Sequence, residues 1–103
     1  MLVSKPYANK EIVTFKLVNG DEVVARVLDQ TDSAFVIEKP CTVIPAQGGL
    51  HLIQSLFSAE INNSIELKFA HVMLHSATTK QIADHYYETT TGIKTLNKGG
   101  IIT

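Results

Sequence analysis

The sequence predicts a mainly β domain, a small antiparallel barrel or sandwich, followed by one C-terminal α-helix. Apolar residues alternate with polar ones over several short stretches, which is the pattern of half-buried strands. Turn residues separate these stretches at intervals of about ten residues, a spacing typical of about five short strands in a barrel or sandwich. A helical pattern with a candidate N-terminal cap follows only near the end of the chain.

The first hairpin gives the clearest signal. Apolar residues alternate over residues 11–18 and again over residues 21–29, and Asn19-Gly20 lies between the two stretches. Asn-Gly is the strongest two-residue hairpin signal, because a type I′ turn needs positive φ at both central residues. We therefore expect two antiparallel strands joined by a type I′ turn.

Further strands are expected downstream. Residues 34–44 are β-branched and apolar, and Pro40 interrupts them. Since proline removes a ladder donor, we expect an edge position or a bulge there. Residues 50–57 and 65–69 alternate again, and residues 72–74 continue as extended structure. The pattern leaves open whether 50–57 and 65–69 are separate strands or one interrupted strand.

The expected helix begins at a candidate capping box formed by Thr78 and Gln81. Ile82 and Tyr86 then lie one turn apart, and Gly92 is placed to end the helix. Four segments result: a loose N-terminal arm (1–10), the β domain (11–77), the helix (78–91) and a flexible tail (92–103).

Composition and charge narrow the class of protein. The 103 residues suit one domain with a net charge of −1, which does not by itself indicate a nucleic-acid partner. Arg26 is the only arginine, which counts against sequence-specific base readout. The single cysteine, Cys41, indicates a reducing compartment. With no apolar signal segment at the start and no long apolar run, we expect a cytoplasmic protein that does not enter a membrane.

Catalytic and metal chemistry find little support. His71 and His75 are four residues apart, but in a strand that spacing is about 13 Å, too far for one ion. Cys41 lies in an apolar stretch and has no nucleophile motif around it, so it is interpreted as a small core residue. We expect no enzyme activity, no metal and no cofactor.

The first hairpin resembles the opening motif of Sm and Sm-like proteins, strongly bent five-stranded barrels that assemble into rings on RNA. That motif alternates apolar residues, reaches a glycine turn and continues through a second strand to an aspartate-containing loop. The matching positions are Val13, Phe15, Leu17, Gly20 and Val27, and Asp32 falls one residue beyond the family's loop aspartate.

The second Sm motif is matched by Leu67, Lys68 and Val72, with Phe69 where the family has glycine. The run Phe69-Ala70-His71 is similar to the tyrosine-lysine-histidine of the bacterial host-factor branch (Hfq). The proline after the third strand and the C-terminal helix look most like the divergent Sm-like proteins of phages, including cyanophages.

This resemblance implies a five-stranded antiparallel Sm-like (SH3-like) barrel that forms a homo-oligomeric ring of roughly five to seven subunits. It also implies single-stranded RNA or DNA as a partner, bound without catalysis in the processing or regulation of that nucleic acid. The implied contact residues are Lys68, Phe69 and His71, with Gln30, Asp32 and Ser33 in the neighbouring loop.

Several positions depart from the family pattern. Ser33 and Ala34 stand where the family usually has asparagine, and Ala25 replaces the second glycine of the first motif. Phe69 has two interpretations, a base-stacking ring or a core residue beside a solvated Lys68. The alternative function is a small β-barrel interaction module, such as a phage structural or regulatory adaptor, without nucleic-acid binding. The near-neutral charge and the single arginine favour that alternative.

Overall fold

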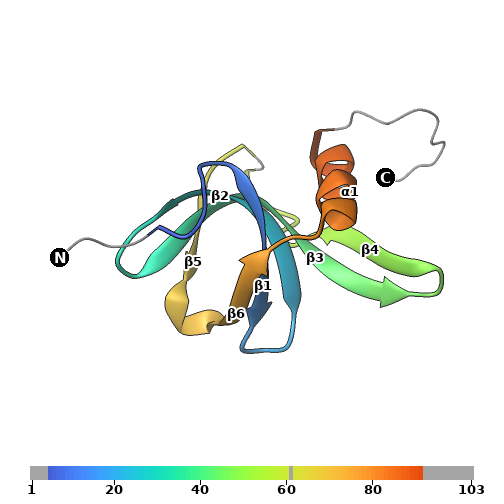
Figure 1. The fold of residues 1–103 in the computed structure, drawn as a ribbon, viewed down its shortest axis with the longest axis horizontal. Helices are drawn as coiled ribbons and strands as arrows, with labels where there is room; N and C mark the ends of the chain where they lie inside the picture. The colour runs from blue at the N-terminus through green and yellow to red at the C-terminus, as the bar shows by residue number, and fades with distance from the viewer. Residues whose placement is uncertain (1–4, 61, 92–103) are drawn as a thin grey trace.

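The computed structural model describes residues 5–60 and 62–91 (Figure 1). It confirms a mainly β, antiparallel fold with one C-terminal helix. The elements are β1 (Glu11–Leu17), β2 (Glu22–Gln30), β3 (Ala34–Ala46), β4 (Gly49–Gln54), β5 (Ile65–Lys68), the 3₁₀ turn η1 (Phe69–His71), β6 (Val72–Ala77) and α1 (Lys80–Thr91). The expected tail, residues 92–103, lies outside the described residues.

The sheet has six strands, so the expectation of five is wrong. Two features raise the number. Residues 50–57 and 65–69 contribute separate strands, β4 and β5. The turn η1 then separates β5 from the extended segment that follows, which forms β6. The short η1 turn redirects the chain, and β6 pairs with β1 whereas β5 pairs with β3.

The strand order is β4-β3-β2-β1-β6, with β5 also paired to β3. The first part of β3 pairs with β5 and its last part pairs with β4, both along the edge of β3 opposite to β2. The sheet curls strongly, while the β3–β4 hairpin projects away from the curl (Figure 1). No ladder joins β5 to β6 within the described residues, so the sheet is curved and open rather than a closed barrel.

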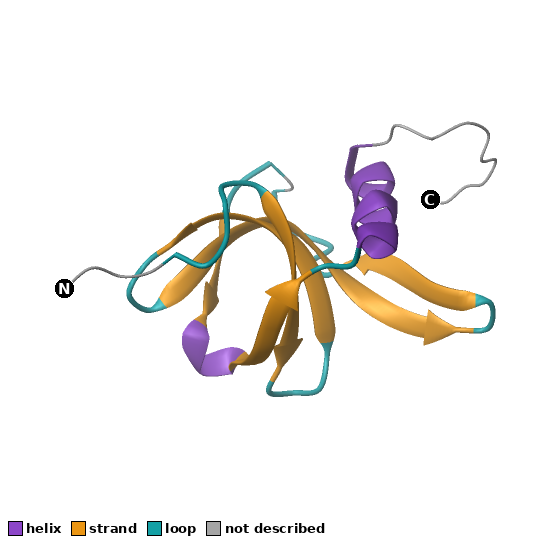
Figure 2. Cartoon of the chain, in the orientation of Figure 1, coloured by secondary structure: helices purple, strands orange, loops and turns teal. Residues whose placement is uncertain are grey.

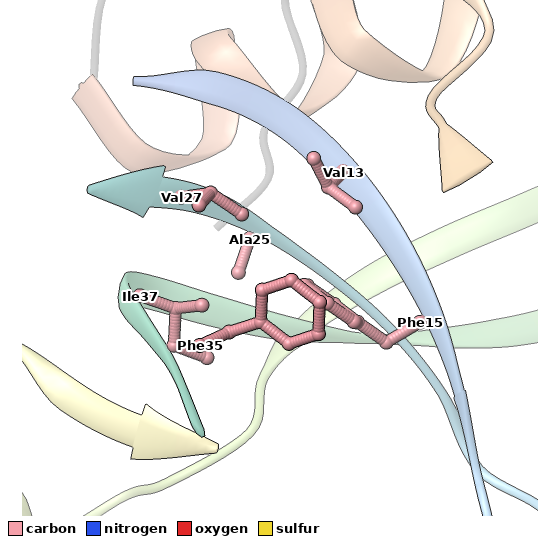
Figure 3. Close-up of a cluster of buried hydrophobic side chains, with 6 residues drawn as sticks. All are labelled: Val13, Phe15, Ala25, Val27, Phe35 and Ile37. Atoms are coloured by element: carbon pink, nitrogen blue, oxygen red, sulfur yellow. The ribbon is translucent and has the colours of Figure 1, made fainter. Parts of the chain in front are cut away.

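Two hydrophobic clusters lie on opposite faces of the sheet, because successive strand residues point to opposite sides. The first cluster fills the inside of the curl, where Phe15 and Phe35 approach with ring centroids 5.1 Å apart (Figure 3). Its buried members are Val13, Phe15, Ala25, Val27, Phe35 and Ile37. The second cluster lies between α1 and the sheet and consists of Val24, Cys41, Val43, Leu52 and Tyr86.

Pro40 lies where the sequence predicts, at a bulge. The β2–β3 register shifts between the Val24↔Cys41 and Arg26↔Glu38 pairs, so β3 carries an extra residue there. Lys39 adopts a positive φ of 51°, a conformation that is uncommon outside glycine. Pro40 also falls between the segments of β3 that pair with β5 and β4, where a missing N–H leaves no ladder bond unmade.

The first hairpin turn is not type I′. Gly20 has φ 97°, but Asn19 is absent from the described non-glycine residues with positive φ, which are Lys10 and Lys39. Gly20 donates its N–H to Leu17 (2.9 Å), and Leu17 donates to Asp21 (2.8 Å), which closes a three-residue loop. This is the hairpin form in which one glycine in a left-handed conformation follows an ordinary turn. The Asn19 side chain accepts from the Asp21 N–H instead (3.0 Å).

Helix α1 lies beside the base of the β3–β4 hairpin (Figure 2), where Tyr86 joins the second cluster and Ile82 packs against it. Its cap is one residue later than expected: the Thr79 hydroxyl accepts from the Ile82 N–H at 3.4 Å. The expected cap, Thr78, bonds the Thr14 hydroxyl of β1 at 2.7 Å and so fixes the approach of the chain to the helix. The competing tertiary partner explains the shift.

The N-terminal segment is not loose over its described part, residues 5–10. Lys5 pairs with Asp29 at 2.8 Å, and the Asn9 amide donates to the Leu28 carbonyl at 2.7 Å. The Tyr7 hydroxyl and His75 Nδ1 lie 2.6 Å apart, so this segment is tied to both β2 and β6. The expectation of a loose arm rested on the polar composition of the segment, which does not reveal these contacts with distant strands.

Candidate nucleic-acid interface

The two groups of expected contact residues come from two chain connections. Asp32 and Ser33 belong to the loop between β2 and β3, and Phe69 opens η1 between β5 and β6. The β3–β5 ladder pairs Ala34 with Lys68, and the Phe69 N–H donates to the Ser33 carbonyl at 2.9 Å. The structure therefore brings the loop after β2 directly against the end of β5.

Lys68 supplies a cation at this junction. Its ammonium group lies 3.0 Å from Glu66 Oε1, and both side chains are more than half exposed, at 54% and 59%. An exposed ion pair of this kind is worth little and is screened by salt, so Lys68 can exchange Glu66 for another anion at small cost. Glu66 nevertheless offsets part of the positive potential.

Phe69 packs at the edge of the core and keeps part of its ring exposed. The ring packs edge-on against Phe35, with centroids 5.0 Å apart and an interplanar angle of 74°, and joins the rim of the first cluster. The side chain is only half-buried, so part of the ring remains accessible to a ligand. Phe69 is thus a core residue that also lines the surface.

The loop between β2 and β3 is ordered by Thr31. Its hydroxyl accepts from the N–H groups of Ser33 (3.2 Å) and Ala34 (3.0 Å), so the turn does not use the side chains of Asp32 and Ser33. Asp32 and Ser33 are exposed. The Asp32 carboxylate repels phosphate, whereas the Ser33 hydroxyl can donate a hydrogen bond to it.

His71 is not brought to the same place as the other expected residues. It is exposed at the far end of η1, and its carbonyl accepts from the Val18 N–H beside the first hairpin turn, at 2.9 Å. Its ring does not line the open pocket described next.

An open pocket of about 510 Å³ lies beside this junction, within the range of roughly 300–1,000 Å³ for small-ligand pockets. We call it the aromatic hollow. It is lined by Pro6, Gln30, Phe35, Phe69, Val72, Met73 and His75. Two expected site residues, Gln30 and Phe69, are among these. The hollow occupies the side where the sheet stays open.

Aromatic contacts define one end of the aromatic hollow. The His75 ring lies 5.2 Å from Phe35 and 5.6 Å from Tyr7, both edge-on. Burial, followed by the Glu11 carboxylate, raises the pKa of Tyr7 above its ordinary value, so its hydroxyl keeps its proton at neutral pH. Sequence reasoning missed Tyr7, Met73 and His75 at this place, because these positions come together only through long-range pairing.

Other chemistries have no comparable site in the described part of the chain. No group of three His, Cys, Asp or Glu side chains there could hold a metal ion. Burial raises the pKa of the Cys41 thiol to about 11, so it is not an activated nucleophile. No helix among residues 5–60 and 62–91 has the length and apolar character to cross a membrane.

The comparisons with known proteins give no family assignment. The chain matches no protein-family model and no curated protein.

Proposed function

We propose that this protein is a non-catalytic, homo-oligomeric Sm-like ring that binds single-stranded RNA or DNA. One observation carries the proposal: the β2–β3 loop meets Lys68 and Phe69 at the edge of the aromatic hollow, with a 2.9 Å hydrogen bond joining Phe69 to Ser33. A cation beside an accessible aromatic ring is the combination that holds a phosphate and stacks a base.

In this mechanism a base stacks against the exposed part of Phe69 while its phosphate approaches Lys68. The Ser33 hydroxyl gives a further donor to the backbone. Binding releases counterions, so the affinity falls steeply as salt rises. A site with a single cation is weak, and repetition around a ring would raise the overall affinity through avidity.

The edges of the sheet support self-assembly. β4 and β6 are its two end strands, and neither contains Asp, Glu, Lys or Arg, the charges that usually protect an edge. Large apolar side chains are exposed on both, including Ile53 at 44% and Leu74 at 65%. Joining two different edges is a head-to-tail contact, which closes into a ring of roughly five to seven copies when the rotation permits.

Lys68→Ala tests the site. Fluorescence anisotropy with labelled oligo-U and oligo-A at low salt should show micromolar binding to the unaltered protein. Among the described residues, Lys68 is the cation where the β2–β3 loop meets the end of β5. Its removal should therefore weaken binding about tenfold and reduce the salt dependence.

The matched control is Lys80→Ala on α1, an exposed lysine that is also paired to a carboxylate, Asp84, at 2.9 Å. It removes the same charge from α1, an element that takes no part in the junction, and should leave the affinity within about twofold. Equal effects of the two substitutions, or no binding at tens of micromolar protein, would contradict the proposal.

The second candidate is a protein-interaction adaptor. The pairing of Lys68 with Glu66 and the exposed apolar residues of the β3–β4 region, among them Leu50 and Phe57 (80% exposed), favour it. An oligomer that binds neither oligonucleotide would support the adaptor over the nucleic-acid-binding ring.

A further inference from the structure

A second cavity lies at the β3 bulge, and we call it the bulge pocket. It is lined by residues 39–41 of β3, by four residues between 54 and 60, by Ile65 of β5 and by residues 89–90 of α1. Residues 39–41 fall where the outer edge of β3 passes from its pairing with β5 to its pairing with β4. The bulge pocket shares no lining residue with the aromatic hollow.

The bulge pocket has the size and the walls for a short aliphatic group. Its volume is about 70 Å³. That is roughly half of the ~150 Å³ cavity that encloses a benzene ring. The apolar side chains in its lining include those of Pro40, Leu56 and Ile65. A branched group of three or four carbons therefore suits it.

Lys39 and Glu60 bring opposite charges to this pocket without neutralising each other. Both line it, and among residues 5–60 and 62–91 no ion pair joins the two or ties either one to another side chain. Lys39 is half-buried, whereas Glu60 is exposed. A half-buried ammonium group without a carboxylate partner favours the approach of an anion, because part of its hydration is already lost.

The backbone at Lys39 gives an independent reason to expect a ligand there. Its φ of 51° lies in the left-handed region, where glycine is less strained than lysine. The Tyr86 hydroxyl holds the bulge in this form by donating to the carbonyls of Glu38 (3.1 Å) and Lys39 (2.9 Å). Strained residues of this kind gather at ligand sites. A lysine at such a position is explained if its side chain binds a ligand.

We propose that the bulge pocket binds a small zwitterion, an α-amino acid with a short branched aliphatic side chain. The aliphatic group packs against Pro40, Leu56 and Ile65. The ligand carboxylate pairs with the Lys39 ammonium group, and the ligand ammonium group pairs with the Glu60 carboxylate. One small molecule thus satisfies both charges. This site is separate from the proposed nucleic-acid interface and does not depend on it.

The probe is L-valine, whose isopropyl group has three carbons and whose two charges are carried next to each other. Isothermal titration calorimetry with the full chain should give a Kd of about 1 mM, the range for a ligand with so few atoms. Isovalerate lacks the ammonium group and isobutylamine lacks the carboxylate, so each should bind at least about tenfold more weakly. L-phenylalanine should also bind at least about tenfold more weakly, because its ring exceeds the pocket.

Lys39→Gly removes the cation and relieves the positive φ at the same time. It should weaken valine binding at least about tenfold without lowering the Tm, which separates a lost ligand contact from a lost fold. The matched control is Lys10→Gly, because Lys10 also has a positive φ (71°) and does not line the bulge pocket. It should leave the affinity for valine unchanged.

Glu60→Gln tests the second charge on an exposed side chain. It should weaken valine binding about tenfold and abolish the preference for valine over isovalerate. Amide chemical shifts in the valine titration should change at residues 39–41 and 89–90. No binding at about 10 mM valine, shift changes confined to other residues, or an unchanged affinity in Lys39→Gly would overturn the site. Equal affinities of the unaltered protein for valine and isovalerate would overturn the zwitterion.

Discussion

Cys41 shows how the environment of one residue decides its chemistry. The side chain is 3% exposed in the second cluster, beneath α1. Desolvation of the thiolate raises the thiol pKa from 9.0 to about 11. The sequence interpretation of Cys41 as a small core residue is confirmed by this burial, and it follows that ionisation of the thiol changes the stability only at high pH.

The stability of the protein should fall between pH 9 and about 11 because of this thiol. In that window the unfolded chain loses the Cys41 proton and the folded chain keeps it, so the free energy of unfolding decreases by at most about 1.4 kcal/mol per pH unit. Below pH 9 both states are protonated and the contribution is complete. Urea titrations from pH 8 to about 11 measure it.

Cys41→Ala is the control for this pH dependence. The substitution removes the titrating group, while Tyr86, whose pKa is also raised by burial and by Cys41, remains in both proteins. The unfolding free energies of the two proteins should converge as the pH rises. Parallel pH curves would show that the thiol is not desolvated as described.

At the scale of elements, Tyr86 is the buried side chain that anchors α1. Tyr86 is fully buried, and its hydroxyl shares its hydrogen between the carbonyls of Glu38 (3.1 Å) and Lys39 (2.9 Å). These carbonyls belong to the bulge where Lys39 has a positive φ. The Arg26 guanidinium lies 5.7 Å from the ring centroid and pairs with Glu38 at 3.3 Å. The helix thus stabilises the bend of β3.

Tyr86→Phe should lower the free energy of unfolding by about 1–2 kcal/mol, because two partly buried carbonyls lose their donor while the packing of the ring is kept. Chemical denaturation monitored by circular dichroism measures the change. Tyr87→Phe, on the same helix but 45% exposed, should change the value by less than about 0.5 kcal/mol. Equal losses in the two variants would contradict the anchoring role.

Local sequence patterns predicted the strands and the helix better than the turns, caps and strand ends between them. Alternation located the strands, because the inward residues of β1 and β2 form the first cluster. The sequence missed the turn type at Gly20, because Asn-Gly also fits a three-residue loop. It missed the cap at Thr79 and the division of β5 from β6, because Thr78 bonds Thr14 of β1 and the two strands pair with different partners. Long-range partners decide these last two features.

At the scale of the whole molecule, the site is a consequence of incomplete closure. β5 and β6 pair with different strands and leave one side of the curl open, where the N-terminal segment and the aromatic hollow lie. The family resemblance singled out Gln30 and Phe69, and both line the aromatic hollow. It could not place Tyr7 opposite His75, because the two are 68 positions apart. In the proposed ring, the uncharged edges of β4 and β6 would pair with other copies of the chain.

Native mass spectrometry of the full chain with an oligo-U strand tests the central claim most directly, because one spectrum reports both assembly and binding. The account predicts a single closed species of roughly five to seven copies that carries the RNA strand. The Lys68→Ala variant should keep the assembly and lose the RNA. A monomer at every concentration, or an oligomer that never carries RNA at low salt, would contradict the account.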